Sequence, residues 1–313
     1  MKANAYGLGA RQVCAALTEC HRFAVATADE AKEVRSIRPD CEVLILGEVP
    51  PSDIGTAAEC GAIIAVGSLQ SLTAVSDTAT GADIAVLIDT GMHRDGVDCR
   101  DIDTVMRFFD APGVKVRYVF SHLRGGEDEV QSARLYSLCD ELSRRGYDVP
   151  YSLPATYGAG HCRGIPRIGI GLYGIGRDMP EGVKCAVGWR ARIGRIAEVE
   201  HGEFIGYGHT YRAAGKMRIA TVSAGYADGI FRSLSNAGHV LIGGKRCPIV
   251  GTVCMDMMTA DVTDTECAVG DAATVIGTDG GETLTFAQVA DAAGTIEYEI
   301  SARIGTRVPR IYE

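Results

Sequence analysis

Short apolar segments recur along the first half of the chain and alternate with stretches whose apolar residues have helical spacing. A short apolar run without polar alternation is typical of a strand that is buried on both faces of a parallel sheet. Helical spacing is found at residues 29–37, 68–77 and 126–145. This alternation predicts a parallel sheet with crossover helices, and therefore a fold of the α/β class. Seven apolar runs are present, namely FAVAT at 23–27, VLILG at 43–47, AIIAV at 62–66, IAVLI at 84–88, VRYVF at 116–120, YSLPA at 151–155 and PRIGIG at 166–171.

A barrel of the TIM type, (β/α)8, is the α/β fold that suits this number of repeats. Seven runs leave such a barrel one strand short. The absent strand belongs at the N-terminus, where the chain opens with Met1 and Lys2. We therefore expect residues 1–180 to form a (β/α) barrel whose first strand is mostly missing.

The pattern changes after residue 173. A connector rich in glycine, proline and charge at 174–184 precedes runs in which apolar and polar residues alternate, as in antiparallel strands with one face toward water. Two segments with helical spacing follow, at 285–294 and 295–305, the second ending in Gly305. We expect residues 181–313 to form a smaller, mostly antiparallel β domain. Its alternating runs are RIGRIAEV at 192–199, MRIATVS at 217–223, HVLIGG at 239–244, CPIVGTV at 247–253 and ATVIG at 273–277.

The charge balance narrows the class of partner. The 313 residues carry a formal net charge of -9. Nucleic acids and anionic membranes need a basic surface, so neither is an expected partner. No apolar stretch reaches the roughly 20 residues of a membrane-spanning helix, and no signal-peptide pattern opens the chain. A small-molecule substrate fits this composition better.

The 11 cysteines have neither a CxxC pair nor the regular spacing of a disulfide framework. We therefore expect buried free thiols, as in a reducing cytoplasm, and no metal site. The predicted localisation is cytoplasmic.

A lysine stands at the start of the chain. The segment MKANAYGLG places Lys2 at the expected C-terminal mouth of the first barrel strand, before small residues and glycines that allow a tight turn. Barrel enzymes build their active sites at this mouth. Most lysines in such a position are merely solvated, so spacing alone does not assign Lys2 a covalent role.

KANAYG at residues 2–7 closely resembles the lysine motif of the alanine racemases, pyridoxal-phosphate-dependent enzymes of fold type III. The resemblance covers nearly the whole chain. It implies a TIM-type barrel followed by a β domain, pyridoxal 5'-phosphate as cofactor, and interconversion of L- and D-alanine. The further motifs, in order, are IDTGMHRDG at 88–96, FSHL at 120–123, PRIGIGLYG at 166–174, GYGHTY at 206–211, GYADG at 225–229, CMD at 254–256, TIEYEI at 295–300 and RVPRIY at 307–312.

Racemisation removes the proton from Cα and returns one on the opposite face, so it needs an electron sink and two bases. The resemblance implies that Lys2 holds the cofactor and is one base, and that Tyr207 of a second subunit is the other. A free phenol has a pKa of about 10 and needs a partner that stabilises its anion. By resemblance His122 and Arg167 supply that partner. Arg167 also faces the pyridine nitrogen, and a permanent cation there keeps the nitrogen unprotonated.

The resemblance also implies the remaining cofactor contacts. Backbone N–H groups beside glycine bind phosphate without adding charge, and Gly169 and Ile170 take that role. The hydroxyls of Tyr6, Thr156 and Tyr298 complete the phosphate site. The alternative for the two tyrosines is an ordinary buried phenol with an internal partner.

Recognition of the substrate carboxylate falls to Arg94, whose fork donates two parallel hydrogen bonds. By resemblance the other subunit adds the backbone N–H of Met255, with Asp256 beside it. Where this chain has Leu87, many relatives have a lysine that becomes carbamylated and holds the arginine. Leucine can do neither, so we expect Arg94 to be oriented by an anion or by Asp95.

Relatives carry a segment before the reactive lysine, whereas only Met1 precedes Lys2 here, so the resemblance implies that this N-terminal segment is absent. It also implies a homodimer with shared active sites. Three alternatives stay open: a serine or broad-specificity amino-acid racemase, a non-catalytic pyridoxal-phosphate-binding relative, and an amino-acid decarboxylase. Tyr298 beside the substrate methyl group favours alanine over serine, and a β domain that carries Tyr207 speaks against the non-catalytic relative.

Overall fold

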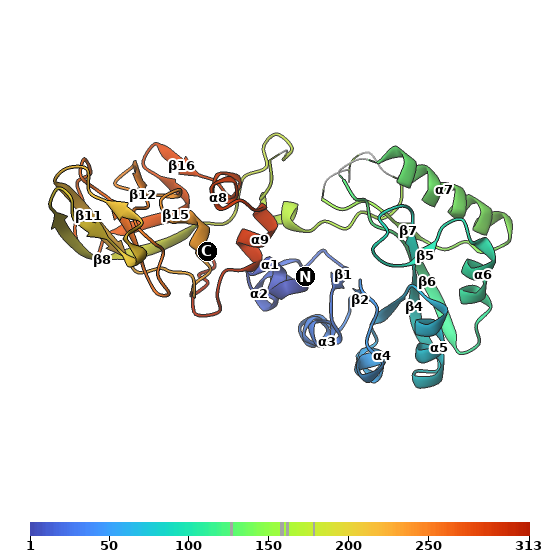
Figure 1. Ribbon diagram of the computed structural model, residues 1–313. Coiled ribbons are helices and arrows are strands. Elements are labelled where there is room, and N and C mark those ends of the chain that lie inside the picture. The colour runs from blue at the N-terminus through green and yellow to red at the C-terminus, as the bar shows by residue number, and fades with distance from the viewer. Residues whose placement is uncertain (126–127, 157–159, 161–162, 178) are drawn as a thin grey trace. The chain divides into compact units, whose positions relative to one another are not determined.

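The computed structural model describes residues 1–125, 128–156, 160, 163–177 and 179–313. The chain divides into two units, Met1–Leu172 and Tyr173–Glu313, each with its own core (Figure 1). No described helix is long and apolar enough to cross a membrane.

The first unit is built on a parallel sheet with strand order β1-β2-β3-β4-β6-β7, and β5 pairs with β4. Strand β3 is buried along its whole length, because a parallel sheet of this class is covered on both faces. With its helices the sheet forms a half-barrel of TIM-type architecture, as the alternating pattern predicts. The strands are β1 (Arg22–Val25), β2 (Glu42–Ile45), β3 (Ile63–Val66), β4 (Ala82–Asp89), β5 (Val97–Asp98), β6 (Val114–Phe120) and β7 (Tyr151–Ser152).

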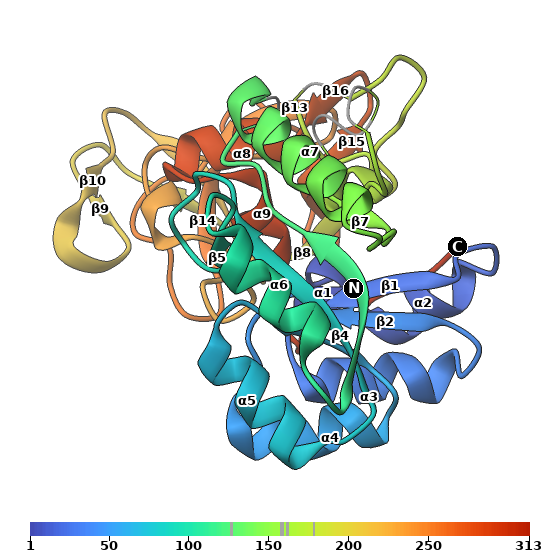
Figure 2. The ribbon, with the colours of Figure 1, turned by 90° about the vertical axis from the view of Figure 1, so that its right-hand side faces the viewer.

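Successive strand residues face two different cores, since side chains alternate along a strand. Ile64 and Val66 of β3 pack against the helices on the outer face. Ile63 and Ala65 face the barrel interior, where they meet Leu87 of β4. Figure 2 shows α3, α4 and α5 along the outer side of the sheet. The helices of this unit are α1 (Lys2–Tyr6), α2 (Ala10–Ala16), α3 (Ala28–Ile37), α4 (Ile54–Glu59), α5 (Leu69–Thr78), α6 (Ile102–Asp110) and α7 (Glu129–Arg144), with a 3-10 turn η1 (Pro51–Asp53).

Side-chain caps start four of these helices, α3, α5, α6 and α7. Thr27 and Ser68 each form a capping box, with the N3 residue of α3 and of α5 respectively. Asp101 and Asp128 accept the N3 amide of α6 and of α7. The helices expected at 29–37 and 68–77 are therefore confirmed. The third, expected at 126–145, corresponds to α7, and residues 126 and 127 lie outside the described residues.

The prediction of a strand at 166–171 is wrong. The amide of Arg167 donates to the carbonyl of Pro154 (2.9 Å), but the next amides turn away from strand pairing. Those of Gly169 and Gly171 donate to the hydroxyl of Thr156, at 3.0 and 3.3 Å. Residues Ile170–Tyr173 then form the 3-10 turn η2. A side chain has replaced the neighbouring strand as the acceptor for these amides.

The second unit is an antiparallel β domain, with strand order β13-β12-β15-β8-β11-β14 and β16 paired to β15. A separate two-stranded sheet joins β9 and β10. Helix α9 ends at Ala302, before the expected Gly305, whose amide donates to the carbonyl of Asp228 at 2.7 Å. The elements are β8 (Trp189–Val199), β9 (Phe204–Ile205), η3 (Tyr207–His209), β10 (Tyr211–Arg212), β11 (Met217–Val222), η4 (Arg232–Leu234), β12 (His239–Ile242), β13 (Lys245–Pro248), β14 (Met258–Asp261), β15 (Ala272–Asp279), β16 (Glu282–Leu284), α8 (Phe286–Ala293) and α9 (Glu297–Ala302).

Candidate active site

Lys2 opens a turn of unusual handedness. In α1 the φ angles of Ala3, Asn4 and Ala5 are 52°, 53° and 54°, and that of Tyr6 is 59°. The segment is therefore a left-handed helical turn. This conformation costs an L-residue about 1–2 kcal/mol, so tertiary contacts must hold it.

Two polar side chains brace this turn. Glu30 accepts the amide of Ala3 at Oε1 (2.6 Å) and the amide of Ala26 at Oε2 (2.7 Å). Asn4 Oδ1 accepts the amide of Ala10 at 2.8 Å. The peptide that follows Lys2 is thus tied to the start of α3 and to the end of β1, which fixes where the lysine side chain leaves the backbone.

The surroundings of Lys2 favour its neutral amine. Burial by neighbouring atoms lowers the pKa of Lys2, and the positive charges of Arg94 and Arg167 act in the same direction, whereas Glu30 opposes them. A lysine with a lowered pKa is a better nucleophile and base at neutral pH.

Arg167 is held among uncharged acceptors. Its guanidinium donates to the hydroxyl of Ser152 (2.5 Å) and to the carbonyls of Ser121 (2.6 Å) and Leu153 (3.2 Å). The same group lies 5.6 Å from the ring centre of Phe120. Burial and the charge of Arg94 lower the pKa of Arg167 to about 10, which leaves it a cation at neutral pH.

His122 lies beside this cation. Its Nδ1 is 3.4 Å from Nη2 of Arg167, and because arginine only donates, Nδ1 accepts and the ring proton belongs on Nε2. Burial, followed by the charges of Arg167, Arg94 and Lys2, lowers the pKa of His122 to about 4. The imidazole is therefore neutral at physiological pH.

Tyr6, Thr156 and the backbone of residues 169–171 form a small cradle. A Cβ atom at Gly169 would overlap the hydroxyl of Tyr6, and one at Gly171 would overlap the methyl group of Thr156, so both positions require glycine. Between them Ile170 is fully buried. Burial raises the pKa of Tyr6, so its hydroxyl stays protonated. The amides of Gly169 and Gly171 already donate to Thr156, so the donor groups of the cradle are the two hydroxyls and the amide of Ile170 between the glycines. Hydroxyls and an amide beside glycine are a donor set that suits a phosphate.

Arg94 lies on the exposed loop between β4 and β5. Asp89 anchors that loop, because its Oδ1 accepts the amides of Gly91 (2.8 Å) and His93 (3.1 Å). Asp95 accepts the amide of Gly96 (2.8 Å), and in the described part of the chain it forms no ion pair with Arg94.

Tyr207 is an exposed residue of the second unit, with 72% of its surface accessible. It begins the turn η3, where flanking Gly206 and Gly208 have φ angles of 75° and 74°. The hydroxyl of Thr252 donates to the carbonyl of Tyr207 at 2.8 Å. The turn is thereby fixed to the loop that leads to Met255, while the phenol faces outward.

Met255 and Asp256 belong to the same face of the second unit. The carbonyl of Met255 accepts the amide of Ala227 at 2.9 Å. Asp256 pairs with Arg307 at 2.6 Å, and Arg307 also donates to Asp228 at 2.7 Å. Sequence reasoning missed Arg307, although its RVPRIY motif was noted. Tyr298, the remaining predicted cofactor residue, lies on α9 of this unit and is partly buried.

The sequence also gave no sign of a buried polar layer under Arg167. Thr90, Ser121, Gln131 and Ser152 are at most 4% exposed. Three of them stand at carboxyl ends of barrel strands, directly after β4, directly after β6 and at the end of β7. Position at a strand end was the available signal, because barrel sites are built there.

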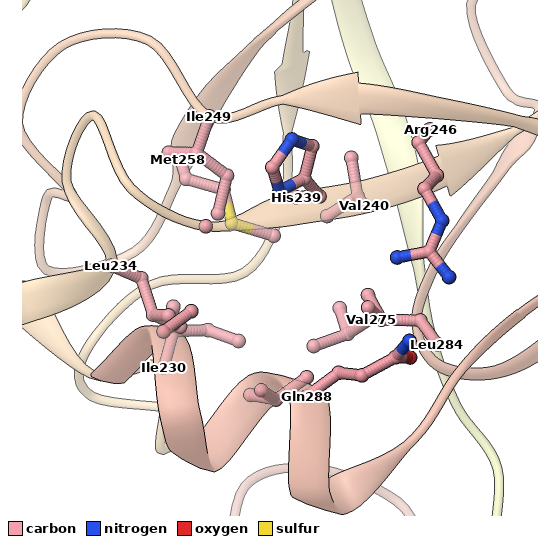
Figure 3. Close-up of a pocket in the computed structure, with 13 residues that line it drawn as sticks. Ile230, Leu234, His239, Val240, Arg246, Ile249, Met258, Val275, Leu284 and Gln288 are labelled. Atoms are coloured by element: carbon pink, nitrogen blue, oxygen red, sulfur yellow. The ribbon is translucent and has the colours of Figure 1, made fainter. Parts of the chain in front are cut away.

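A cavity of about 60 Å³ lies elsewhere, in the second unit between α8 and the sheet. Figure 3 shows apolar side chains such as Leu234, Met258 and Val275 around it, with His239, Arg246 and Gln288 as polar neighbours. Arg246 is already paired with Glu282 at 2.9 Å. The cavity includes none of the predicted site residues.

The family described as "Alanine racemase, N-terminal domain" matches residues 1–177, and "Alanine racemase, C-terminal domain" matches residues 186–312. An alanine racemase of Carboxydothermus hydrogenoformans is 35% identical over 339 residues, which cover 100% of this chain and 91% of that protein.

Two solved structures are similar over the whole chain. The biosynthetic alanine racemase of Pseudomonas aeruginosa is 32% identical with a TM-score of 0.89, and the match covers 100% of this chain and 90% of that one. The alanine racemase of Bartonella henselae, solved with covalently bound pyridoxal phosphate, is 28% identical with a TM-score of 0.89, and covers 100% and 91%.

Proposed function

Since this chain belongs to the alanine racemase family and interconverts L- and D-alanine with pyridoxal phosphate, we propose that it uses two bases, Lys2 and the Tyr207 of a second subunit. When bound, the cofactor withdraws electrons from the Cα–H bond of alanine, which makes that proton removable. Lys2 exchanges a proton on one face of Cα. Tyr207 exchanges a proton on the opposite face.

The cofactor would be held by Lys2 and by the cradle of Tyr6, Thr156, Gly169 and Ile170, with Tyr298 as a further phosphate ligand. The observation that carries this proposal is the convergence of the Tyr6 and Thr156 hydroxyls on the backbone at Gly169, where no side chain fits. Neutral donors of this kind bind a phosphate dianion without adding a fixed positive charge.

Arg167 would control protonation of the cofactor ring nitrogen, and His122 would control protonation of the Tyr207 phenol. Arg167 stays charged although buried, so it disfavours a second positive charge on the cofactor ring nitrogen. Neutral His122, with its proton on Nε2, has a donor that can stabilise the phenolate of Tyr207. This coupling would let a phenol serve as a base at neutral pH.

The substrate carboxylate would be bound by Arg94 of one subunit and by the backbone N–H of Met255 of the other, with Asp256 beside it. Arg94 has an exposed guanidinium that forms no ion pair within the described chain. The Arg307 pair holds Asp256 in place, and the amide of Met255 has no acceptor among the described residues, so it is free to donate.

A homodimer with shared sites is part of this proposal. Phe204, Tyr207, Tyr226, Met255 and Met257 are 44–72% exposed, and such a set of large apolar side chains marks an interaction surface. Their loops adjoin, because Thr252 binds the carbonyl of Tyr207 and the amide of Tyr226 donates to the carbonyl of Cys254 (3.0 Å).

Mixing two inactive variants tests the shared site. Lys2→Ala places its lesion in the barrel and Tyr207→Phe places its lesion in the β domain. In a mixed dimer both lesions fall in one site and leave the other intact, so about a quarter of the wild-type activity should return after random exchange. A mixture that stays inactive, although mass spectrometry detects mixed dimers, would contradict the proposal.

We also propose that the enzyme works in the cytoplasm. All ten cysteines that the structure describes are free, which suits a reducing compartment. Cell fractionation with an activity assay tests this, and activity confined to the periplasm or to the medium would contradict it.

A further inference from the structure

Beside His122 and Arg167 lies a layer of buried polar side chains that the reaction does not itself require. Thr90, Ser121 and Gln131 are at most 1% exposed. Thr90 follows β4, Ser121 follows β6, and Gln131 is in the first turn of α7. Polar groups this deeply buried persist only when their hydrogen bonds are satisfied.

Gln131 uses both ends of its amide. Its Nε2 donates to Thr90 Oγ1 (3.0 Å) and to the carbonyl of His122 (3.1 Å). Its Oε1 accepts the amide of Arg124 at 2.9 Å. Because a carbonyl only accepts and an amide N–H only donates, these partners determine which way round the side-chain amide lies.

The residue before His122 is held as well. Ser121 Oγ lies 2.9 Å from Thr90 Oγ1, and the carbonyl of Ser121 accepts Nη2 of Arg167 at 2.6 Å. Consecutive carbonyls at 121 and 122 therefore bind Arg167 and Gln131 respectively. A shift of one partner must move the backbone that carries His122.

The side chain of Gln131 is not needed to begin the helix. Asp128 caps α7 through the backbone amide of Gln131 (3.0 Å), a bond that any residue except proline can form at 131. Leu135, Leu138 and Leu142 bury the helix against the barrel. A substitution at 131 can thus disturb the layer while the helix stays in place.

We propose that Gln131 is a positioning residue of the active site, which fixes the backbone of His122 and, through Thr90 and Ser121, the carbonyl that orients Arg167. This inference rests on the roles proposed above for His122 and Arg167. Gln131 touches neither substrate nor cofactor in this scheme, so it governs the rate of proton transfer and not the binding of alanine.

The test compares Gln131→Met, which keeps the length but removes the hydrogen bonds and adds no charge, with Gln70→Met. Gln70 is an exposed residue in the first turn of α5 and is the matched control. In Gln131→Met, kcat should fall by about ten- to a hundredfold, as expected for a misplaced catalytic group, while KM for alanine changes less than about twofold. Gln70→Met should leave both constants unchanged.

A second readout needs no cofactor. In the apoprotein labelled with 15N-histidine, the wild-type His122 should titrate at a pKa of about 4. In Gln131→Met the loosened ring should become better solvated and should also leave the field of Arg167, Arg94 and Lys2, so its pKa should rise toward the ordinary value of about 6.5. If the variant only melts earlier, while kcat and the His122 titration match the wild type, the residue is merely structural and the proposal is wrong.

Thr90→Val is the second variant, should Gln131→Met fail to fold. Valine keeps the shape of threonine but removes the hydroxyl that contacts both Gln131 and Ser121, while the bond from Gln131 to the carbonyl of His122 remains, so the same changes should follow in a weaker form. His122→Gln and Arg167→Gln enzymes tested beside them separate the two proposals. If both keep full activity, the roles assigned to His122 and Arg167 fail; if both lose it while Gln131→Met and Thr90→Val behave as wild type, only the positioning role fails.

Discussion

Nη2 of Arg167 lies 3.4 Å from Nδ1 of His122, so a guanidinium cation and an imidazole face one another inside the barrel mouth. In the described chain neither forms an ion pair with a carboxylate. Burial, followed by the charge of Arg167, lowers the pKa of His122, and burial together with the charge of Arg94 lowers that of Arg167, so the imidazole stays neutral beside the cation. This relationship gives the first two predictions.

Replacing His122 with glutamine should remove part of the acid sensitivity of the apoprotein. The pKa of His122 is lowered to about 4, so as pH falls the unfolded chain binds this proton first. The folded state therefore loses stability between about pH 6.5 and pH 4, and nothing further below pH 4. The lowered pKa corresponds to about 3 kcal/mol, which solvent screening of the partly exposed ring reduces to about 2 kcal/mol.

Urea unfolding of the wild type and of His122→Gln at several pH values measures this contribution. The difference in unfolding free energy between the two proteins should be constant above pH 6.5. Between pH 6.5 and pH 4 the unfolding free energy of the wild type should fall relative to that of the variant. His239→Gln, which changes an exposed histidine, is the control. Parallel curves for wild type and His122→Gln would rule the effect out.

Arg167→Gln should stabilise the apoprotein while it abolishes racemisation. Burial lowers the pKa of Arg167 to about 10, which means that the charged guanidinium is less stable in the folded protein than in water. After allowance for lost hydrogen bonds, a neutral amide should raise the free energy of unfolding by about 1 kcal/mol. Urea denaturation measures it, with exposed Arg107→Gln on α6 as the control; a destabilised Arg167→Gln apoprotein would contradict the prediction.

Glu30→Gln should lower the pKa of Lys2 further. The carboxylate braces the left-handed turn through the amide of Ala3 and is the one neighbouring charge that raises the lysine pKa. Competitive acetylation of the apoprotein across pH, followed by peptide mass spectrometry, reports the titration of Lys2. Glu33→Gln, an exposed position on the same helix, should not move it. An unchanged titration in Glu30→Gln would refute the role of this carboxylate.

Gly169→Ala should weaken cofactor binding by about tenfold or more, because overpacking costs about 1–3 kcal/mol. The new methyl group would overlap the Tyr6 hydroxyl and force that side chain out of the cradle. Gly47→Ala is the control, since a Cβ atom there meets open space. Fluorescence titration of the apoprotein with pyridoxal phosphate gives both affinities, and equal values would exclude a phosphate site at this position.

The sequence predicts the elements that local pattern controls. Buried apolar runs identified β1 to β4 and β6, because a parallel strand covered on both faces has no polar positions to reveal. Helical spacing from residue 68 predicted α5, and the structure shows that Ser68 is its N-cap, whose hydroxyl satisfies one of the first free amides.

Features that depend on contacts between residues far apart in the chain could not be predicted from the sequence. Nothing in KANAY indicates a left-handed turn, because its residues disfavour that conformation and Glu30, far along the chain, holds it. The apolar run at 166–171 resembles a strand, but its glycine amides bind Thr156 instead. Gln131 resembles any polar residue in a first helical turn until packing buries it.

Leu87 stands where the family resemblance implies a carbamylated lysine in many relatives, and it packs with Ala85 and Phe120 inside the barrel. A carbamate forms only from dissolved carbon dioxide, so lysine at this place ties substrate binding to the supply of that gas. Leucine removes this dependence. KM for alanine should therefore be the same in degassed, bicarbonate-free buffer and in bicarbonate, and a higher KM after degassing would show that another amine takes up the gas. With leucine at position 87, binding of the substrate carboxylate should therefore not depend on how much carbon dioxide the growing cell is supplied with.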